Sequence, residues 1–130
     1  MPPGARGVQT AGGVVGVVIG RSEGQPRRFR RQPRAEVWGR RVPVALSRSA
    51  RLLGLTLLDR QAAGPGLLLP GCRSVHTFGM RFPLDLVFLD LEWRPLSLRR
   101  GIPPRRFAFD RRAGAVLELP AAEFRRGERR

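Results

Sequence analysis

The feature that most constrains the fold is the apolar run Leu84 to Leu89 (LDLVFL), which only Asp85 interrupts. A strand buried on both faces has an almost continuous apolar sequence, whereas a strand with one wet face alternates apolar and polar residues. The run therefore predicts a central strand over residues 84–90. The stretch from Cys72 to Asp90 also holds the only Cys and the only His of the chain, so core and chemistry are expected together.

A strand and a helix are expected before this stretch. Alternation over residues 41–46 predicts a half-buried strand, and Pro43 within it favours a sheet edge. The apolar spacing then becomes helical, which predicts a helix to about residue 58 with Ser47 or Ser49 as its N-cap. Gly54 inside this helix costs about 1 kcal/mol relative to Ala, which indicates close packing or a kink.

Several short strands with one early helix predict a mostly β fold, a small antiparallel sandwich or partly closed barrel. Further strands are expected over residues 67–69, 73–78, 94–98 and 116–119, and loops over residues 61–66 and 102–106. Pro95 favours a sheet edge for the strand that contains it.

Composition divides the chain into three parts. Residues 1–35 are rich in Gly, Pro and Arg and cannot bury enough apolar area to offset their ordering entropy, which predicts a disordered tail. The apolar run within this tail is far shorter than the roughly 20 residues that cross a bilayer, so no transmembrane segment is expected. Ordered structure is expected over residues 36–124, and residues 125–130 form a short charged tail.

The formal net charge of +15 comes from 25 basic residues, all of them Arg, against 10 acidic ones. The absence of Lys, Asn and Tyr is typical of a GC-rich coding sequence, so much of this charge reflects composition. We therefore expect weak polyanion binding without sequence preference. A single Cys excludes an intramolecular disulfide and favours a reducing compartment, so a cytoplasmic location is expected.

Five segments together resemble the DUF192 family of bacterial and archaeal domains of unknown function. They are RLLGL (51–55), GLLLPGC (66–72), VHTFGMRFPLD (75–85), FLD (88–90) and VLELPA (116–121). The resemblance covers about residues 36–124 and implies a small all-β, jelly-roll-like fold. It implies no activity, because none is established for the family.

Two positions depart from the family's pattern. Ala122 stands where members have Gly before a turn and a final strand, so that last strand is expected to be missing, which leaves a sheet edge open. Trp93 stands where the family prefers Gly in the turn after the central strand, which leaves the conformation of that turn open.

The candidate ligand-binding residues are polar or polarisable side chains in and near the central stretch. They are His76, Met80, Arg81, Asp85 and Glu118. No catalytic residue is assigned. Cys72 and His76 resemble a nucleophile and a base, but on an extended strand they lie about 13 Å apart, beyond hydrogen-bond reach. Cys72 is therefore expected to be a small buried hydrophobe.

Neither a metal nor a cofactor is expected. One His and scattered carboxylates, without an HxH or HxxxH pair, are a poor ligand set for Zn, Mn or Fe. No Gly-rich phosphate-binding loop follows a strand. A glycosidase-like carboxylate pair of Asp85 and Glu118 stays open as an alternative.

The register of His76 against Asp85 decides whether the two can act together. If their strands form a simple hairpin, His76 faces Leu86 and Asp85 points to the opposite side of the sheet. A bulge at Gly79 would instead make His76 and Asp85 direct neighbours. The unbulged register is favoured, which makes His76 a buried structural residue, and Asp85 is expected to accept hydrogen bonds from Arg81 or local backbone amides.

These observations favour a binding or accessory module whose pocket near His76, Arg81 and Asp85 holds a small polar ligand or a partner segment. One alternative is a hydrolase that uses His76 with a carboxylate, which a pocket holding His76 and two carboxylates would favour. The other is a weak, non-specific nucleic-acid binder, which Arg side chains gathered on one face would favour.

Overall fold

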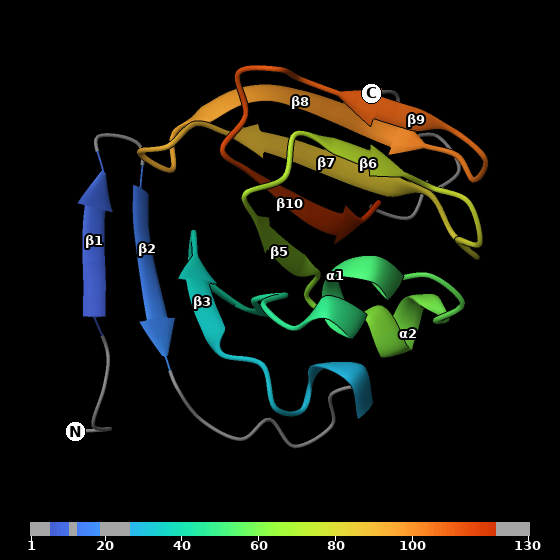
Figure 1. Ribbon diagram of the computed structural model, residues 1–130, viewed down its shortest axis with the longest axis horizontal. Helices are drawn as coiled ribbons and strands as arrows, with labels where there is room; N and C mark the ends of the chain where they lie inside the picture. The colour runs from blue at the N-terminus through green and yellow to red at the C-terminus, as the bar shows by residue number, and fades with distance from the viewer. Residues whose placement is uncertain (1–5, 11–12, 19–26, 122–130) are drawn as a thin grey trace, which may run out of the picture.

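The computed structural model describes residues 6–10, 13–18 and 27–121, and strands dominate them (Figure 1). The strands are β1 (Arg6–Thr10), β2 (Gly13–Val18), β3 (Arg34–Val37), β4 (Arg40–Pro43), β5 (Leu67–Pro70), β6 (Ser74–His76), β7 (Leu84–Leu89), β8 (Pro95–Ile102), β9 (Phe107–Phe109) and β10 (Ala115–Pro120). The helical elements are η1 (Arg27–Phe29), α1 (Arg48–Leu53) and α2 (Arg60–Ala63). The predicted fold class is confirmed: the described chain is mostly β, in several antiparallel sheets that do not close into a barrel.

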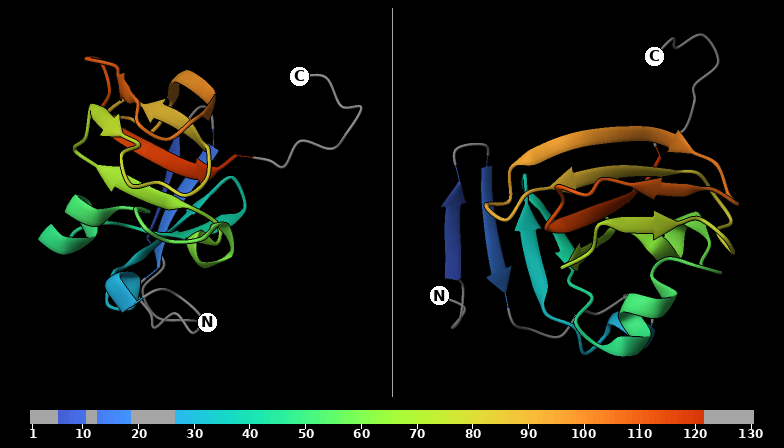
Figure 2. Two further views of the ribbon diagram at one scale, coloured as in Figure 1. Left: turned by 90° about the vertical axis from the view of Figure 1, so that its right-hand side faces the viewer. Right: turned by 45° about the horizontal axis from the view of Figure 1, so that its top comes forward.

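The sheet that positions the site has the strand order β5-β10-β7-β8. The apolar run Leu84–Leu89 forms β7, an inner strand with five of its six residues buried, as predicted. β8 is an edge strand, as Pro95 indicated. Figures 1 and 2 show α1 and α2 on the β5 side of this sheet, away from β8.

Both faces of this sheet are covered by apolar clusters. Neighbouring residues of a strand point to opposite faces, so each strand contributes to both clusters. Leu68, Val87 and Leu117 pack with residues of β3 and β4 in one apolar cluster. Leu86 and Val116 belong to a second cluster, which includes residues of η1, α1, β6 and β9. The site lies on the face of this second cluster.

The strands of a second sheet, of order β1-β2-β3-β4, lie at a steep angle to β7 and β8 (Figure 1). β4 is its edge strand, as Pro43 indicated, but the predicted alternation is wrong from Pro43 on: Pro43 and Ala45 are buried and Leu46 is exposed. The chain leaves the sheet there, because Val44 bridges to Leu68 of β5 and links the two sheets.

The predicted hairpin between residues 73–78 and 84–90 is wrong, because β6 pairs with β9 and not with β7. Buried Thr77 directs the chain away from β7: its hydroxyl donates to Pro103 O (2.7 Å) and accepts from Arg106 N (2.8 Å). These bonds hold residues 77–80 against the loop before β9. β9 itself was not expected from the sequence.

Part of the expected tail, residues 1–35, lies within the described structure. Within the expected tail, residues 6–10 and 13–18 form strands. Phe29 of η1 is only 1% exposed and belongs to the apolar cluster on the site's face. Residues 27–35 therefore pack with the domain, while the wider division into tail and domain stays a prediction.

The predicted helix over residues 47–58 is shorter than expected. Ser47 is its N-cap, as predicted, but α1 ends at Gly54, and a second helix, α2, begins after the N-cap Asp59. The expected missing strand after Ala122 lies outside the described residues. In the described part of the chain, no helix is both long and apolar enough to span a membrane.

Candidate functional site

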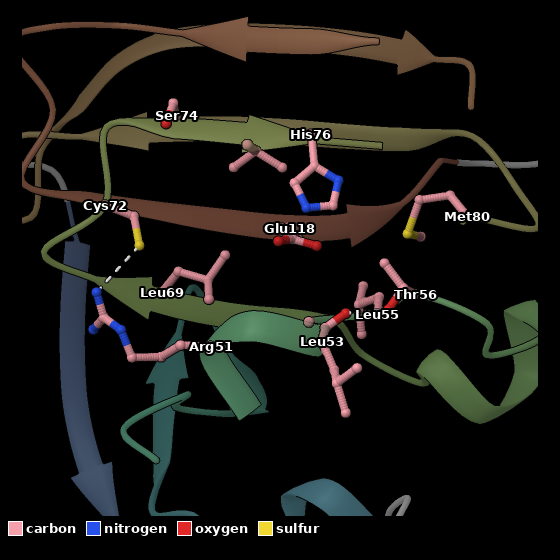
Figure 3. Close-up of a pocket in the computed structure, with 12 residues that line it drawn as sticks. Arg51, Leu53, Leu55, Thr56, Leu69, Cys72, Ser74, His76, Met80 and Glu118 are labelled. Carbon is pink, nitrogen blue, oxygen red and sulfur yellow. Dashed lines mark hydrogen bonds between the residues drawn. The ribbon is translucent and has the colours of Figure 1, made fainter. Parts of the chain in front are cut away.

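A pocket of about 80 Å³ lies between β6, the residues that follow α1, and β10 (Figure 3). The pocket wall includes Leu53 and Leu55 on the helix side, and His76 and Met80 on the side of β6. Glu118 of β10 also lines it. Figure 3 shows the Glu118 carboxyl group between His76 and the end of α1.

Glu118 is an acidic side chain in an apolar sheet face. It is 4% exposed, and its neighbours across the strands are Leu67 of β5 and Leu86 of β7. Among the described residues, nothing forms a hydrogen bond or ion pair with its carboxyl group. Burial disfavours the charged form and raises the pKa of Glu118 from 4.5 to about 8, so the carboxyl is mostly protonated at neutral pH.

Gly54 brings the end of α1 close to this carboxyl group. It caps the helix with a φ of 51°, a conformation that favours glycine. A Cβ atom at this position would lie 3.5 Å from Glu118 Oε1. An added Cβ atom would thus be in ordinary contact with the Glu118 carboxyl, and it is the positive φ at the end of the helix that requires glycine at position 54.

Arg28 holds this end of α1 in place from outside the pocket. Its Nη1 donates to Gly54 O (3.0 Å) and to Thr56 O (2.8 Å), carbonyl groups that follow the last helical turn. Carbonyl groups at a helix C-terminus lack intrahelical partners and carry partial negative charge, so a guanidinium group suits them. A residue of the expected tail thus supports the pocket.

The opposite end of the pocket is formed by Arg51 and Cys72. Arg51 Nη1 donates to Pro70 O (2.7 Å), and its Nη2 lies 3.5 Å from Cys72 Sγ, as Figure 3 shows. Cys72, expected to be a small buried hydrophobe, is half-buried and packs against the apolar cluster on this face, after Gly71, with a φ of 70°, turns the chain.

His76 lies at the pocket wall and is exposed, so the expected buried structural histidine is wrong. On β6 the inward position belongs to Val75, which leaves His76 on the outer face. The ring centroid of His76 lies 6.1 Å from that of Phe78 and 6.5 Å from that of Phe107. Two exposed aromatic rings therefore accompany it at the surface.

Asp85 and Arg81, two of the five candidate residues, are not part of the pocket wall. Asp85 lies opposite Leu119 and therefore on the other sheet face from Glu118, so the two cannot form a carboxylate pair. Asp85 Oδ1 accepts from Gly101 N (2.7 Å), an amide of β8 rather than a local one. Arg81 is exposed.

The structure brings together His76, Met80 and Glu118 from the predicted set and adds Arg51, which was not among the candidate residues. In the sequence, Gly54 within the predicted helix was the feature that pointed to the end of α1 as part of the pocket wall. In the described part of the chain, no three His, Cys, Asp or Glu side chains are grouped so that they could hold a metal ion.

Comparisons with known proteins agree with the resemblance found in the sequence. The model of the DUF192 family, described as "Uncharacterized ACR", matches residues 31–128. No curated protein matches the chain.

Two solved structures share its fold. A protein of unknown function from Novosphingobium aromaticivorans superposes with a TM-score of 0.56 at 16% identity, over 90% of this chain and 81% of that one. A putative transcription regulator from Sinorhizobium meliloti superposes with a TM-score of 0.55 at 22% identity, over 69% of this chain and 72% of that one. At these identities the likeness shows the fold alone.

Proposed function

This chain belongs to the DUF192 family, and we propose that it is a binding module that holds a small polar ligand in the pocket over Glu118. The predicted class of function, a binding module, is unchanged, but the proposed site lies over Glu118 rather than near Arg81 and Asp85. His76, Met80 and Glu118 are retained as ligand-binding residues, whereas Arg81 and Asp85 are not. A cytoplasmic location, expected from the single Cys, stays a prediction.

The buried carboxyl group of Glu118 is the observation that supports this function. The carboxyl group of Glu118 lines the pocket, has no partner among the described residues, and lies between the apolar residues Leu67 and Leu86 of the neighbouring strands. An apolar side chain at residue 118 would suit the sheet better. Such a group in a pocket is a candidate for ligand recognition, because the ligand can supply the missing partner.

The hydrolase alternative receives less support. General acid–base catalysis by two carboxyl groups requires both to flank the reacting bond. Among the described residues, the pocket wall holds one carboxyl group, that of Glu118, while Asp85 points away on the other sheet face. His76 lies at the same pocket, but no hydrogen bond joins it to Glu118 in the described part of the structure.

A screen of small polar fragments by ligand-observed NMR tests the proposal. Ser74 is an exposed residue of the pocket wall on β6, so Ser74→Trp should fill the pocket mouth and abolish fragment binding. Arg100→Trp adds the same bulk at an exposed position of β8 outside the pocket wall and should leave binding unchanged. Fragments that bind both variants equally, or a screen without any binder, would contradict the proposal.

A further inference from the structure

We propose that the ligand carries a primary ammonium group, which enters the pocket and forms an ion pair with the carboxylate of Glu118. This inference rests on the proposed function and names the chemical class of the ligand. The site is defined by geometry: a pocket of about 80 Å³, and at its wall an acidic side chain that is 4% exposed and lacks a partner among the described residues.

Among the charged and titratable side chains of the described pocket wall, none pairs with Glu118, so a cationic ligand can do so. Arg51 of α1 is the cationic residue of the wall, and it is engaged with Pro70 O and Cys72 Sγ. The other titratable groups of the described wall are Cys72 and His76. The strands on either side of Glu118 present leucines to it.

The size and lining of the pocket suit an alkyl ammonium ion. A water molecule occupies about 30 Å³ in the liquid, so the pocket has room for a compact group of a few non-hydrogen atoms. An ammonium group is a compact charge with three donors, and the carboxylate can accept from it. Leu53, Leu55 and Met80 offer an apolar wall for the alkyl stem.

The surface beside His76 also favours a cation. The rings of Phe78 and Phe107 lie outside the pocket wall and are exposed beside His76, with centroids 5.2 Å apart. Aromatic ring faces attract ammonium groups by about 0.5–1 kcal/mol at exposed sites. The net charge of +15 opposes a cationic ligand, but charges beyond about 8 Å are largely screened at physiological ionic strength, so contacts inside the pocket dominate.

Binding must release a proton. Glu118 is mostly protonated at neutral pH, because burial raises its pKa to about 8. When the ammonium ion enters, the carboxyl O–H bond breaks, the proton leaves to solvent, and carboxylate and ammonium remain paired. Affinity should therefore rise roughly tenfold per pH unit below this pKa and level off above it. A neutral ligand that needs the protonated carboxyl would show the opposite dependence.

The experiment titrates the full chain with butylammonium, butanol and butyrate, which share an alkyl stem and differ in charge. Butylammonium should bind best, with affinity rising as pH rises. Glu118→Gln keeps the side-chain shape, removes the charge, and should weaken butylammonium binding by roughly tenfold or more. Glu36→Gln, at an exposed carboxyl of β3, should leave binding unchanged.

Two measurements keep the test decisive. If Glu118→Gln does not fold, calorimetry of the wild-type chain in two buffers of different ionisation enthalpy should still show proton release on butylammonium binding. Nα-acetyl-lysine amide distinguishes the source of the group: tighter binding than butylammonium assigns it to a protein lysine, and weaker binding assigns it to a free amine.

The outcomes separate this inference from the proposed function. Binding of butanol or butyrate that Ser74→Trp abolishes, without binding of butylammonium, would overturn the ammonium ligand and leave the pocket as a binding site. Butylammonium affinity that falls with rising pH would also overturn it. A chain that binds none of the three compounds and no screened fragment would overturn both.

Discussion

Two glycines end the two α-helices in almost the same conformation, and one of them faces the pocket. Gly54 has φ 51° and ψ −131°, and Gly64 has φ 57° and ψ −130°. A Cβ atom at Gly54 would meet Glu118 Oε1 at 3.5 Å, whereas one at Gly64 would meet nothing within 4 Å. Backbone strain on substitution should therefore be the same at both positions, and contact with Glu118 should differ.

This pair makes a matched prediction. Gly54→Ala and Gly64→Ala should each lower the free energy of unfolding by about 1–3 kcal/mol, because both place a side chain at positive φ. Urea unfolding measures this loss. Gly54→Ala alone should raise the pKa of Glu118 further and weaken pocket binding, because its methyl group displaces solvent from the carboxyl. Equal effects of the two variants on ligand binding would contradict the pocket's geometry.

The candidate residues show what residue type predicts and what it cannot. Glu118 and His76 stood out as titratable groups in apolar sequence, and both line the pocket. The sequence could not place Asp85, because the face it points to depends on the register of β7 against β10. His76 was expected to be buried because its partner strand was assigned as β7 rather than β9.

At the scale of elements, η1 and the end of α1 are joined by one side chain. Arg28 donates to the carbonyl oxygens of Gly54 and Thr56, across 26 and 28 positions of sequence. Phe29, next to it, is buried in the core. The short helical turn η1 therefore supports the wall of the pocket without lining it.

Replacing Arg28 tests this support. Arg28→Ala should lower the free energy of unfolding by about 1.5–3 kcal/mol, because it removes charge-assisted hydrogen bonds to two carbonyl groups. It should also weaken fragment binding, since the residues after α1 lose their anchor. Arg27→Ala removes an exposed guanidinium from the same turn and should change neither quantity. Binding that Arg28→Ala leaves intact would show that the pocket wall holds its shape without η1.

The elements that could be predicted are those whose burial follows their apolar pattern. The run Leu84–Leu89 predicted β7, and the segments at 67–69 and 116–119 predicted β5 and β10. β9 could not be predicted, because its pattern is inverted: Ala108 points inward, while Phe107 and Phe109 are exposed. Large apolar residues on the outer face indicate nothing about pairing until the partner strand is known.

At the scale of the whole molecule, two carboxyl groups give stability an unusual dependence on pH. Burial raises the pKa of Glu118 to about 8, so the folded state holds this proton more tightly than the unfolded state. Arg112 and Ser97 hydrogen-bond Asp110 and hold its pKa at about 2, below its usual 3.8. Stability is therefore lost as pH falls through the pKa of Asp110, and again as pH rises from 4.5 to about 8.

The predicted curve has its maximum in mildly acidic solution. Between pH 4.5 and about 8, Glu118 should lower the free energy of unfolding by on the order of 1.4 kcal/mol per pH unit. Urea unfolding across this range measures the slope. Glu118→Gln should flatten it and be more stable than the wild type at the alkaline end. A wild-type curve that rises toward pH 8 would contradict the buried, unpaired carboxyl.

The net charge of +15 also belongs to the whole molecule. It should produce weak binding to duplex DNA that does not depend on sequence and that collapses as salt rises, because phosphate contacts release counterions. Fluorescence anisotropy at two salt concentrations measures this. Tight binding to one sequence at physiological salt would instead favour the nucleic-acid alternative.

The pKa of Glu118 itself tests most directly whether a buried carboxyl group binds the ligand. The side-chain carboxyl ¹³C resonance of Glu118, assigned by its loss in Glu118→Gln, is followed across pH in the free chain and with butylammonium. We expect a pKa of about 8 for Glu118 in the free chain, because burial disfavours the charged carboxylate, and a lower pKa when the ammonium ion is bound. A free-chain pKa near the ordinary 4.5 would show a solvated or paired carboxyl and contradict the account.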